Sequence, residues 1–413
     1  MLEKPLLNKL SQKTYDMALI ILVTLMDIAL CAEADIYVPA FPQMVKYFGI
    51  AENHIHLVLS INFAGLCIAA LVAGPLSDSF GRRKVLLGGL LIFVISSFGC
   101  VYVDNFKIML LWRLIQGIAA SVPMVVGCAT FLDKYTAEKA GQTIGAINSI
   151  TFAAMAGAPI MGAWISQIFN WRANFVVILV LAITSFFGTF IFIEETLPEN
   201  KRKAFQPLAI LHDYIKILKN IEFICYVMIV NFAFIGVVVY VANLSLILIN
   251  YMGMSLQEFS LWQASTMGTF VFFSLASIKF IGVKGVEYTK NLGGILATIG
   301  SISLLYIAQT DMTNIFMVSL AMAFIAAGGA LMVGTFGIKA LSVFPEINGT
   351  ASAMMMSMRQ LLASSLVLLS ELLFDGTIVP VAKIIFGYGV VAMGCYIILC
   401  LTVSPSKLDA NTE

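Results

Sequence analysis

Three carboxylates lie close together in the first long apolar stretch of the chain, at Asp27, Glu33 and Asp35. Successive residues of an α-helix turn by about 100°, so Asp27 and Asp35 point about 80° apart and lie two turns apart in height. One cavity can therefore be lined by both acids. Because a low dielectric penalises the charged form, such a carboxylate can exchange a proton near neutral pH. Asp27 and Asp35 are therefore candidate proton-binding groups.

Two further residues bear on this chemistry. Glu33 points about 160° from Asp35 on the same helix, so we expect it to face elsewhere, near the extracellular end and water. Arg113 lies in a later apolar stretch and is followed by Gln116. A buried arginine normally needs a partner, so pairing with Arg113 for structure is the alternative role of Asp27 and Asp35. In the proton-binding interpretation, Arg113 and Gln116 hold the acids in alternative arrangements.

Other polar residues inside apolar stretches are candidate lining for a substrate cavity, together with Gln116. They are Tyr37, Asn62, Asn148, Asn231 and Tyr240. Arg359 is a sixth, about ten residues into another apolar stretch. If Arg359 faces the cavity, it favours an anionic ligand. If it pairs with an acid or reaches the inner interface, it is structural, and the sequence leaves both possibilities open.

The elements that must position these residues are membrane-spanning helices. Of the 413 residues, 60% are hydrophobic and only 11% are charged, whereas roughly a quarter are charged in soluble domains. A spanning helix needs about 20 mostly apolar residues, and these long runs lack the alternation of a membrane barrel. The runs that qualify are residues 17–39, 54–76, 85–103, 107–132, 142–167, 172–193, 222–249, 256–278, 290–309, 313–338, 349–374 and 378–403.

The basic residues predict the orientation of these helices. With the N-terminus in the cytoplasm, 18 of the 24 lysines and arginines fall in inside segments, and four fall in outside segments or at their edges. Such a bias is the positive-inside pattern, and it predicts that both termini are cytoplasmic. We therefore expect a multi-pass protein of the cell inner (cytoplasmic) membrane.

The longest polar interruption, residues 194–221, follows the sixth predicted helix. It predicts two six-helix bundles, residues 1–193 and 222–413, joined by a cytoplasmic linker. The predicted fold is an all-α membrane protein of 12 transmembrane helices, with the bundles related by pseudo-two-fold symmetry. In transporters of this layout the binding site lies between the bundles, near the midplane.

The sharpest local signal is the run from Gly74 to Lys84, GPLSDSFGRRK, which we place on the loop between the second and third helices. Its glycines allow a tight turn, and Asp78 can meet a helix N-terminus, where the dipole favours a negative charge. Arg82 follows one turn later and can pair with Asp133 at the inner end of the fourth helix. The alternative is a simple turn in a basic inside loop.

The fifth predicted helix contains Gly157, Pro159 and Gly162, in the run AGAPIMGA. Small residues permit close helix approach, and proline bends a helix. Packing alone would therefore explain this run.

Together these motifs resemble those of a known family. The run from Gly74 matches the GxLxDxxGRR signature of the major facilitator superfamily, RLIQG at Arg113 matches its RxxQG pattern, and the run around Pro159 resembles its antiporter motif. With DIYVPAFP at residues 35–42 and WRANF at residues 171–175, the chain looks like the Bcr/CflA group of drug:proton antiporters. The layout matches over the whole chain, but the specific motifs lie in residues 27–175.

The resemblance implies roles for the matched residues. Asp27 and Asp35 match the acidic positions of the first helix, and Arg113 and Gln116 match the pair of the fourth, so Asp27, Glu33, Asp35 and Arg113 are the candidate proton-coupling set. The implied conformational latch consists of Gly74, Asp78, Gly81, Arg82, Arg83 and Asp133. In the outward-open state of the family, its acid meets the eleventh helix. The second half departs from the pattern, since only GVKG at residues 282–285 remains of the loop motif.

The function implied is that of a secondary active, proton-coupled antiporter that exports small organic compounds by alternating access, as in multidrug efflux and antibiotic resistance. The alternative is a transporter of an anionic metabolite or siderophore that uses Arg113 and Arg359. We expect no enzyme activity and no cofactor, because there is no catalytic constellation or phosphate-binding loop. The three histidines show no metal-ligand spacing.

The expected partners follow from the same properties. A net charge of +1 provides no basic excess for nucleic acid. The partners are therefore a small-molecule substrate, protons and the lipid bilayer, and we expect a monomer.

Overall fold

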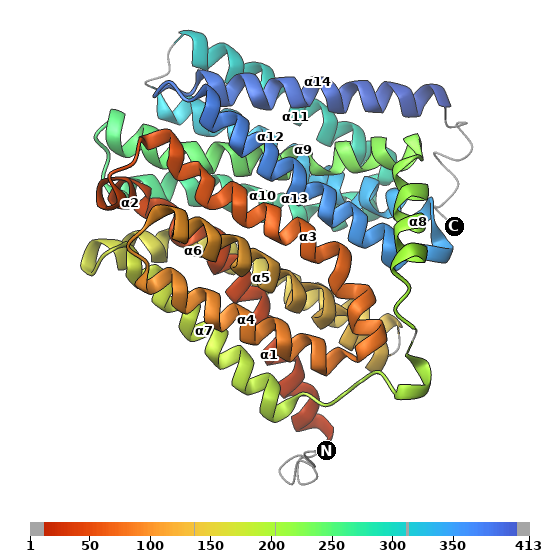
Figure 1. The fold of residues 1–413 in the computed structure, drawn as a ribbon. Helices are drawn as coiled ribbons and strands as arrows, with labels where there is room; N and C mark the ends of the chain where they lie inside the picture. The colour runs from red at the N-terminus through yellow and green to blue at the C-terminus, as the bar shows by residue number, and fades with distance from the viewer. Residues whose placement is uncertain (1–11, 136, 203, 311–313, 403–413) are drawn as a thin grey trace. The chain divides into compact units, whose positions relative to one another are not determined.

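The computed structural model describes residues 12–135, 137–202, 204–310 and 314–402, and within them the chain is helical without β-strands (Figure 1). The helices longer than 20 residues are α1 (Gln12–Asp35), α3 (Leu57–Phe80), α4 (Arg82–Tyr102), α5 (Phe106–Lys134), α6 (Ala137–Ile168), α7 (Trp171–Phe192), α9 (Ile221–Ser245), α10 (Leu256–Lys284), α11 (Val286–Thr310), α12 (Ile315–Ser342), α13 (Asn348–Leu373) and α14 (Val379–Thr402). Two shorter α-helices are α2 (Phe41–Phe48) and α8 (Pro207–Leu218). Each long helix overlaps one of the predicted spans, so the all-α membrane fold is confirmed.

The long helices have the length and surface of membrane-spanning segments. Among the described residues, 11 helical segments are long and apolar enough to cross a membrane. The remaining long helix, α6, has 32 residues, and many of its side chains lie outside the described set. Large apolar side chains remain exposed, such as Trp164 at 58% and Leu401 at 81%. Lipid contact accounts for such surfaces, whereas water would not.

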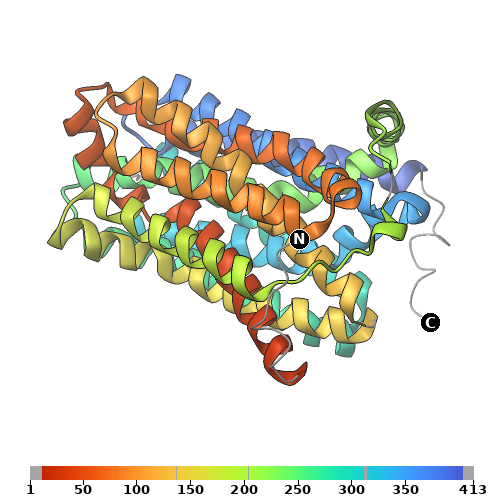
Figure 2. The same cartoon turned by 60° about the horizontal axis from the view of Figure 1, so that its bottom comes forward.

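The chain divides into two compact units. Unit 1 comprises residues 1–49 and 61–207, and unit 2 comprises residues 50–60 and 208–413. The segment expected as a linker begins in unit 1 and contains α8, most of which belongs to unit 2. Both ribbon views show α8 running across the direction of the long helices of unit 2 (Figures 1 and 2).

Each unit contains one pair of long helices separated by a single glycine. Gly81, with φ of 98°, separates α3 from α4, and Gly285, with φ of 85°, separates α10 from α11. Glycine adopts this left-handed region without the clash that a Cβ would cause. The same local break thus recurs in both halves, although the surrounding sequence motif is intact only in the first.

This break corrects the expectation that the GPLSDSFGRRK run forms a loop. Residues 74–80 continue α3, with Pro75 inside the helix, and residues 82–84 already belong to α4. Hydropathy marks where the apolar run ends. The helix can continue beyond that point because its backbone hydrogen bonds are made within the helix, in water as well as in lipid.

Apolar packing fixes the rotation of α1 in unit 1. Its residues Leu19, Val23 and Met26 are buried in a cluster with Leu90 of α4 and Val126 of α5. Burial of these side chains is favourable, so this face of α1 is held against its neighbours. The acids that follow along α1 therefore have defined directions.

Candidate functional site

A buried polar network joins α1, α3 and α5 within unit 1. The guanidinium of Arg113 lies 2.8 Å from the carboxylate of Glu33, and neither side chain is exposed. The side-chain nitrogen of Asn62 donates to the same carboxylate and to the backbone carbonyl of Arg113, the latter at 3.1 Å. One ion pair and one amide therefore connect three helices.

Both terminal nitrogens of Arg113 have further acceptors. One donates to the side-chain oxygen of Gln116. The other donates to the Tyr37 hydroxyl at 2.7 Å and to the backbone carbonyl of Glu33 at 3.2 Å. Gln116 in turn donates to Ser97 of α4 at 2.8 Å. This saturation of the guanidinium offsets the desolvation of a fully buried charge.

The position of Glu33 corrects an expectation. Its side chain is fully buried, so the prediction that it lies near water is wrong. As expected, Glu33 lies on a different face of α1 from Asp27 and Asp35. That face packs against α3 and α5 and not against water. Arg113 therefore pairs with Glu33, and the alternative in which Asp27 or Asp35 pairs with Arg113 is not what the structure contains.

Asp27 and Asp35 occupy a different situation on the same helix. Both side chains are intermediate in burial, and Asp35 is the last residue of α1. Within the described residues, neither carboxylate has a hydrogen-bond or ion-pair partner. An unpaired acid in a spanning helix is costly to maintain, and such residues are characteristic of functional sites.

The WRANF run extends the network to α7. Phe175 stacks on Tyr37, with ring centres 5.0 Å apart. Arg172 donates to two backbone carbonyls at the C-terminal end of α4, at 3.1 and 3.0 Å, and to the Asp104 carboxylate at 2.7 Å. Trp171 is buried beside them. This run therefore fixes the start of α7 and supports the ring that covers Arg113.

Two glycines allow the helices around the network to approach closely. A Cβ at Gly117 would overlap the backbone carbonyl of Asn62, and a Cβ at Gly162 would overlap the backbone carbonyl of Ile36. Gly157, by contrast, has nothing within 4 Å of a Cβ position. Pro159 is buried between them in α6. Close packing therefore explains Gly162 and leaves Gly157 unexplained.

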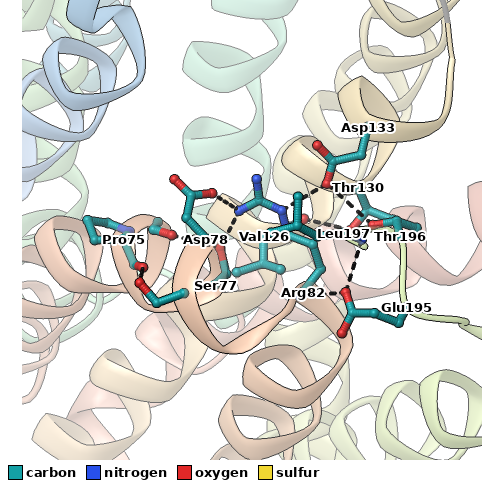
Figure 3. Close-up of polar contacts among 12 residues, drawn as sticks. Pro75, Ser77, Asp78, Arg82, Val126, Thr130, Asp133, Glu195, Thr196 and Leu197 are labelled. Carbon is teal, nitrogen blue, oxygen red and sulfur yellow. Dashed lines mark hydrogen bonds and ion pairs between the residues drawn. The ribbon is translucent and has the colours of Figure 1, made fainter. Parts of the chain in front are cut away.

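A second charged cluster surrounds the break at Gly81 (Figure 3). The Nε of Arg82 donates to Asp133 of α5 at 2.9 Å, so the pair expected from the sequence is present. Arg82 also forms an ion pair with Asp78, one turn back on α3, and donates to the Ser77 hydroxyl. One guanidinium thus links the end of α3 to the end of α5.

Glu195 is a member of this cluster that sequence reasoning missed. Its carboxylate accepts from the backbone N–H groups of Arg82 at 2.8 Å and of Leu197 at 3.1 Å (Figure 3). Because Arg82 is the first residue of α4, the carboxylate lies at the positive end of that helix. A Cβ at Gly81 would overlap this carboxylate, so both backbone angle and space require glycine there. The available signal was the acidic pair Glu194–Glu195 directly after the apolar run of α7.

The other proposed latch residues have local contacts. Arg83 donates to the backbone carbonyl of Phe190 on α7 at 3.0 Å. The backbone carbonyl of Gly74 accepts from the Ser77 hydroxyl at 2.8 Å. Both contacts stay within unit 1.

Unit 2 also contains buried polar side chains with atoms that lack a hydrogen-bond partner among the described residues, as do the second oxygen of Glu33 and the amide oxygen of Asn62 in unit 1. Asn231 and Tyr240 of α9 are each 1% exposed. The Asn231 side-chain nitrogen has no hydrogen-bond partner among the described residues, whereas the Tyr240 hydroxyl interacts with Ser319. Gln263 of α10, which the sequence did not single out, is fully buried. Neither its amide nitrogen nor its amide oxygen has a hydrogen-bond partner among the described residues. Buried polar atoms are usually satisfied, so these call for a functional explanation. The side chain of Asn148 lies outside the described residues.

Arg359 of α13 has no acidic partner within the described chain. Its guanidinium lies 4.7 Å from the ring centre of Phe234, and one terminal nitrogen is 3.7 Å from the sulfur of Met356. Its Nε is buried without a hydrogen-bond partner there. The structural alternative of an ion pair with a nearby acid is therefore not found.

A family model described as Major Facilitator Superfamily matches residues 17–368. The chain belongs to the major facilitator superfamily. It is 25% identical over 384 residues to the multidrug resistance protein MdtL of Salmonella typhi, covering 92% of this chain and 94% of that protein. It is 22% identical over 325 residues to a bicyclomycin resistance protein homolog of Haemophilus influenzae, covering 79% and 81% respectively.

Solved structures agree at the level of the fold. The xylose transporter XylE from E. coli, in a partially occluded inward-open conformation, superposes with a TM-score of 0.72 at 15% identity over 95% of this chain and 99% of that chain. The major facilitator fold expected from the sequence is thereby confirmed. The match to the family model supports the expected role as a transporter.

Proposed function

We propose that this major facilitator protein exports small organic compounds in exchange for protons across the cytoplasmic membrane. The names of its relatives, which refer to multidrug and bicyclomycin resistance, support the substrate class. The observation that supports proton coupling is the contrast on α1, where Glu33 pairs with Arg113 while Asp27 and Asp35 have no ion-pair partner among the described residues. The proposal includes cytoplasmic termini, two rocking halves (residues 1–193 and 222–413) and a monomer.

The proposed coupling uses this contrast. The Glu33–Arg113 pair has no net charge and fixes α1 against α5, so it provides a rigid wall. Asp27 and Asp35 are then the groups that can take up a proton when they face the outside and release it to the cytoplasm. A cationic or bulky substrate that enters from the cytoplasm competes with that proton for the same carboxylates.

The charged cluster at Gly81 is the proposed latch. Gly74, Asp78, Gly81, Arg82, Arg83 and Asp133 form its core. Because Arg82 contacts Asp78 and Asp133 together, movement of α3 relative to α5 would change both pairs at once. We infer that Asp78 engages α13 in one conformation of the transport cycle and loses that contact in the other.

The polar candidates divide into two groups in this proposal. Tyr37, Asn62 and Gln116 are committed to the Arg113 network and shape the site indirectly. Asn231 and Gln263 retain unused polar atoms and are proposed direct contacts of the substrate, together with Tyr240, which is buried on the same helix as Asn231. Asn148 stays a candidate on its sequence position.

Transport in proteoliposomes tests the proposal. An imposed pH gradient should drive accumulation of a cationic drug by the parent chain, and the Asp27→Asn and Asp35→Asn variants should lose this drive. A Glu346→Gln variant removes an exposed carboxylate that lies between α12 and α13 and serves as the charge control. Unchanged pH-driven transport in both α1 variants would sink the mechanism, and a sodium gradient that replaces the pH gradient would reassign the coupling ion.

Arg359 favours a second candidate, a transporter of an anionic metabolite or siderophore. Its guanidinium has no carboxylate partner among the described residues, so it could bind an anion without first breaking an ion pair. This hypothesis also assigned Arg113 to the anion. The guanidinium of Arg113 already pairs with Glu33, so we expect it to contribute less to anion binding. Thermal-shift measurements across cationic, neutral and anionic compounds separate the candidates. Stabilisation by anions alone, lost in Arg359→Ala, would favour the second.

A further inference from the structure

A cavity of about 790 Å³ lies inside unit 2, between α9, α11, α12 and α14. Its floor is apolar and includes Phe232 of α9, Phe336 of α12 and Phe386 of α14. All its walls come from one unit, so its shape depends only on packing within that unit. It is separate from the Arg113 network and from the cluster at Gly81, both of which lie in unit 1.

The cavity opens sideways between α11 and α14, which run alongside one another in unit 2 (Figure 1). Its lining residues Ile295, Ile299, Val390 and Met393 are 57%, 47%, 57% and 44% exposed. Large exposed aliphatic side chains on spanning helices face lipid. The mouth of the cavity is therefore a groove in the lipid-facing surface.

One end of the groove carries a single positive charge. Lys290 of α11 is only 4% exposed, and its ammonium lies 2.6 Å from the carboxylate of Glu287, which is 52% exposed. The rings of Tyr396 and Phe336 flank it, with centres 5.4 and 6.0 Å from the ammonium nitrogen. The ammonium is thus held in place at the border between the apolar groove and the polar end of α11.

The depth of the groove matches one leaflet. The lining extends from Lys290 to Ile302, twelve residues further along α11, which is about 18 Å along the helix axis. Half of a hydrocarbon core of about 30 Å is about 15 Å. An apolar chain that entered beside Lys290 would therefore reach the middle of the bilayer without leaving the groove.

We propose that this groove binds one anionic phospholipid of the cytoplasmic leaflet, with its phosphate at Lys290 and an acyl chain between α11 and α14. Basic pockets between spanning helices on the cytoplasmic side are suited to anionic headgroups. The carboxylate of Glu287 already pairs with the Lys290 ammonium, so it competes with the phosphate for the same positive charge. The proposal rests on the proposed orientation of the helices and not on proton coupling or on the identity of the cargo.

The chain offers matched variants for each part of the proposal. Lys290→Ala removes the charge at the groove, and Lys284→Ala removes a charge from the exposed end of α10 nearby. Gly294→Leu fills the groove, whereas Gly394→Leu adds the same side chain on α14 outside it; neither glycine has an atom within 4 Å of a Cβ position. Glu287→Gln removes the competitor.

Native mass spectrometry of the purified full chain, titrated with phosphatidylglycerol or phosphatidylcholine, measures the binding directly. We expect one tightly held phosphatidylglycerol, about fivefold weaker binding in Lys290→Ala, and tighter binding in Glu287→Gln. Gly294→Leu should lose the bound lipid, while Lys284→Ala and Gly394→Leu should match the parent.

Several outcomes would overturn the proposal. Equal binding of both lipids, or no effect of Gly294→Leu, would remove the site. Displacement of phosphatidylglycerol by millimolar inorganic phosphate would show a site for free phosphate instead, and displacement by a transported drug would make the groove part of the cargo route. Because the measurement needs no ion gradient, its failure is distinguishable from failure of the antiport mechanism.

Discussion

Glu33 and Arg113 form an ion pair from which solvent is fully excluded, with 2.8 Å between carboxylate and guanidinium. Each residue alone would be a buried charge in a spanning helix, which is among the most costly features a membrane protein can contain. Together they give a neutral unit that holds α1 against α5. Because Arg113 already pairs with Glu33, Asp27 and Asp35 have no counter-charge within the part of the chain that the structure describes.

Removal of one partner should therefore be far worse than removal of both. Glu33→Ala leaves the guanidinium of Arg113 without its carboxylate and should destabilise the chain by about 3–5 kcal/mol. The double variant Glu33→Leu/Arg113→Met should recover much of that loss. Thermal unfolding in detergent of Glu33→Leu, of Arg113→Met and of the double variant gives the coupling, and simple additivity would contradict the pair's role.

Asp27→Asn and Asp35→Asn should leave stability nearly unchanged. Neither carboxylate has a partner within the described residues, so the amide breaks no contact, and we expect a change within about 0.5 kcal/mol. The same thermal measurement applies, with Glu33→Gln as the variant that does lose a charged contact. A large loss of stability in Asp27→Asn would indicate a structural partner and weaken the proton-coupling assignment.

Glu195 should hold the start of the segment formed by residues 194–221 against α4. Glu195→Ala removes the acceptor for the N–H groups of Arg82 and Leu197, and loss of such a capping interaction costs about 1 kcal/mol. Local opening should expose Arg202 to trypsin, so cleavage there should accelerate. Glu199→Ala is the control, because Glu199 is 87% exposed and contacts only Arg202 among these groups. Equal cleavage in both variants would show that Glu195 does not anchor the segment.

Gly157 and Gly162 should respond in opposite ways to the same change. Gly162→Ala places a methyl group on the backbone carbonyl of Ile36 and should force α6 away from α1, with a clear drop in thermal stability and transport. Gly157→Ala meets nothing within 4 Å, and because alanine favours a helix it should be neutral or stabilising by up to about 1 kcal/mol. If Gly157→Ala keeps full stability but loses transport, its role is conformational and not one of packing.

The long helices could be predicted because each needs about 20 apolar residues, and that requirement is visible locally in the sequence. The ends of the helices are harder to predict from the sequence. For example, α3 continues through Pro75 to Phe80, beyond its apolar run. The direction of Glu33 also followed from helix geometry. Its partner did not, because the sequence does not say which helix covers that face of α1.

Long-range contacts set the remaining limits. Glu195 binds the backbone of Arg82 across 113 positions of sequence, and no local pattern connects the two. The groove beside Lys290 depends on how far α11 stands from α14, which is a property of packing. In the sequence alone, Lys290 is only one of 24 basic residues, and nothing around it indicates a groove.

The separation of Glu33 from Arg113 has a consequence for biosynthesis. The two residues are 80 positions apart, so α3 and α4 leave the ribosome between them. During that interval α1 carries four carboxylates, Asp16, Asp27, Glu33 and Asp35, without the counter-charge of Arg113, and an acid within a spanning helix is costly. We therefore expect the nascent α1 to stay at the insertion machinery until α5 delivers its counter-charge. A chain truncated before α5 should therefore integrate α1 into the bilayer poorly. Membrane integration of α1 would then depend on the synthesis of α5 and not on α1 alone.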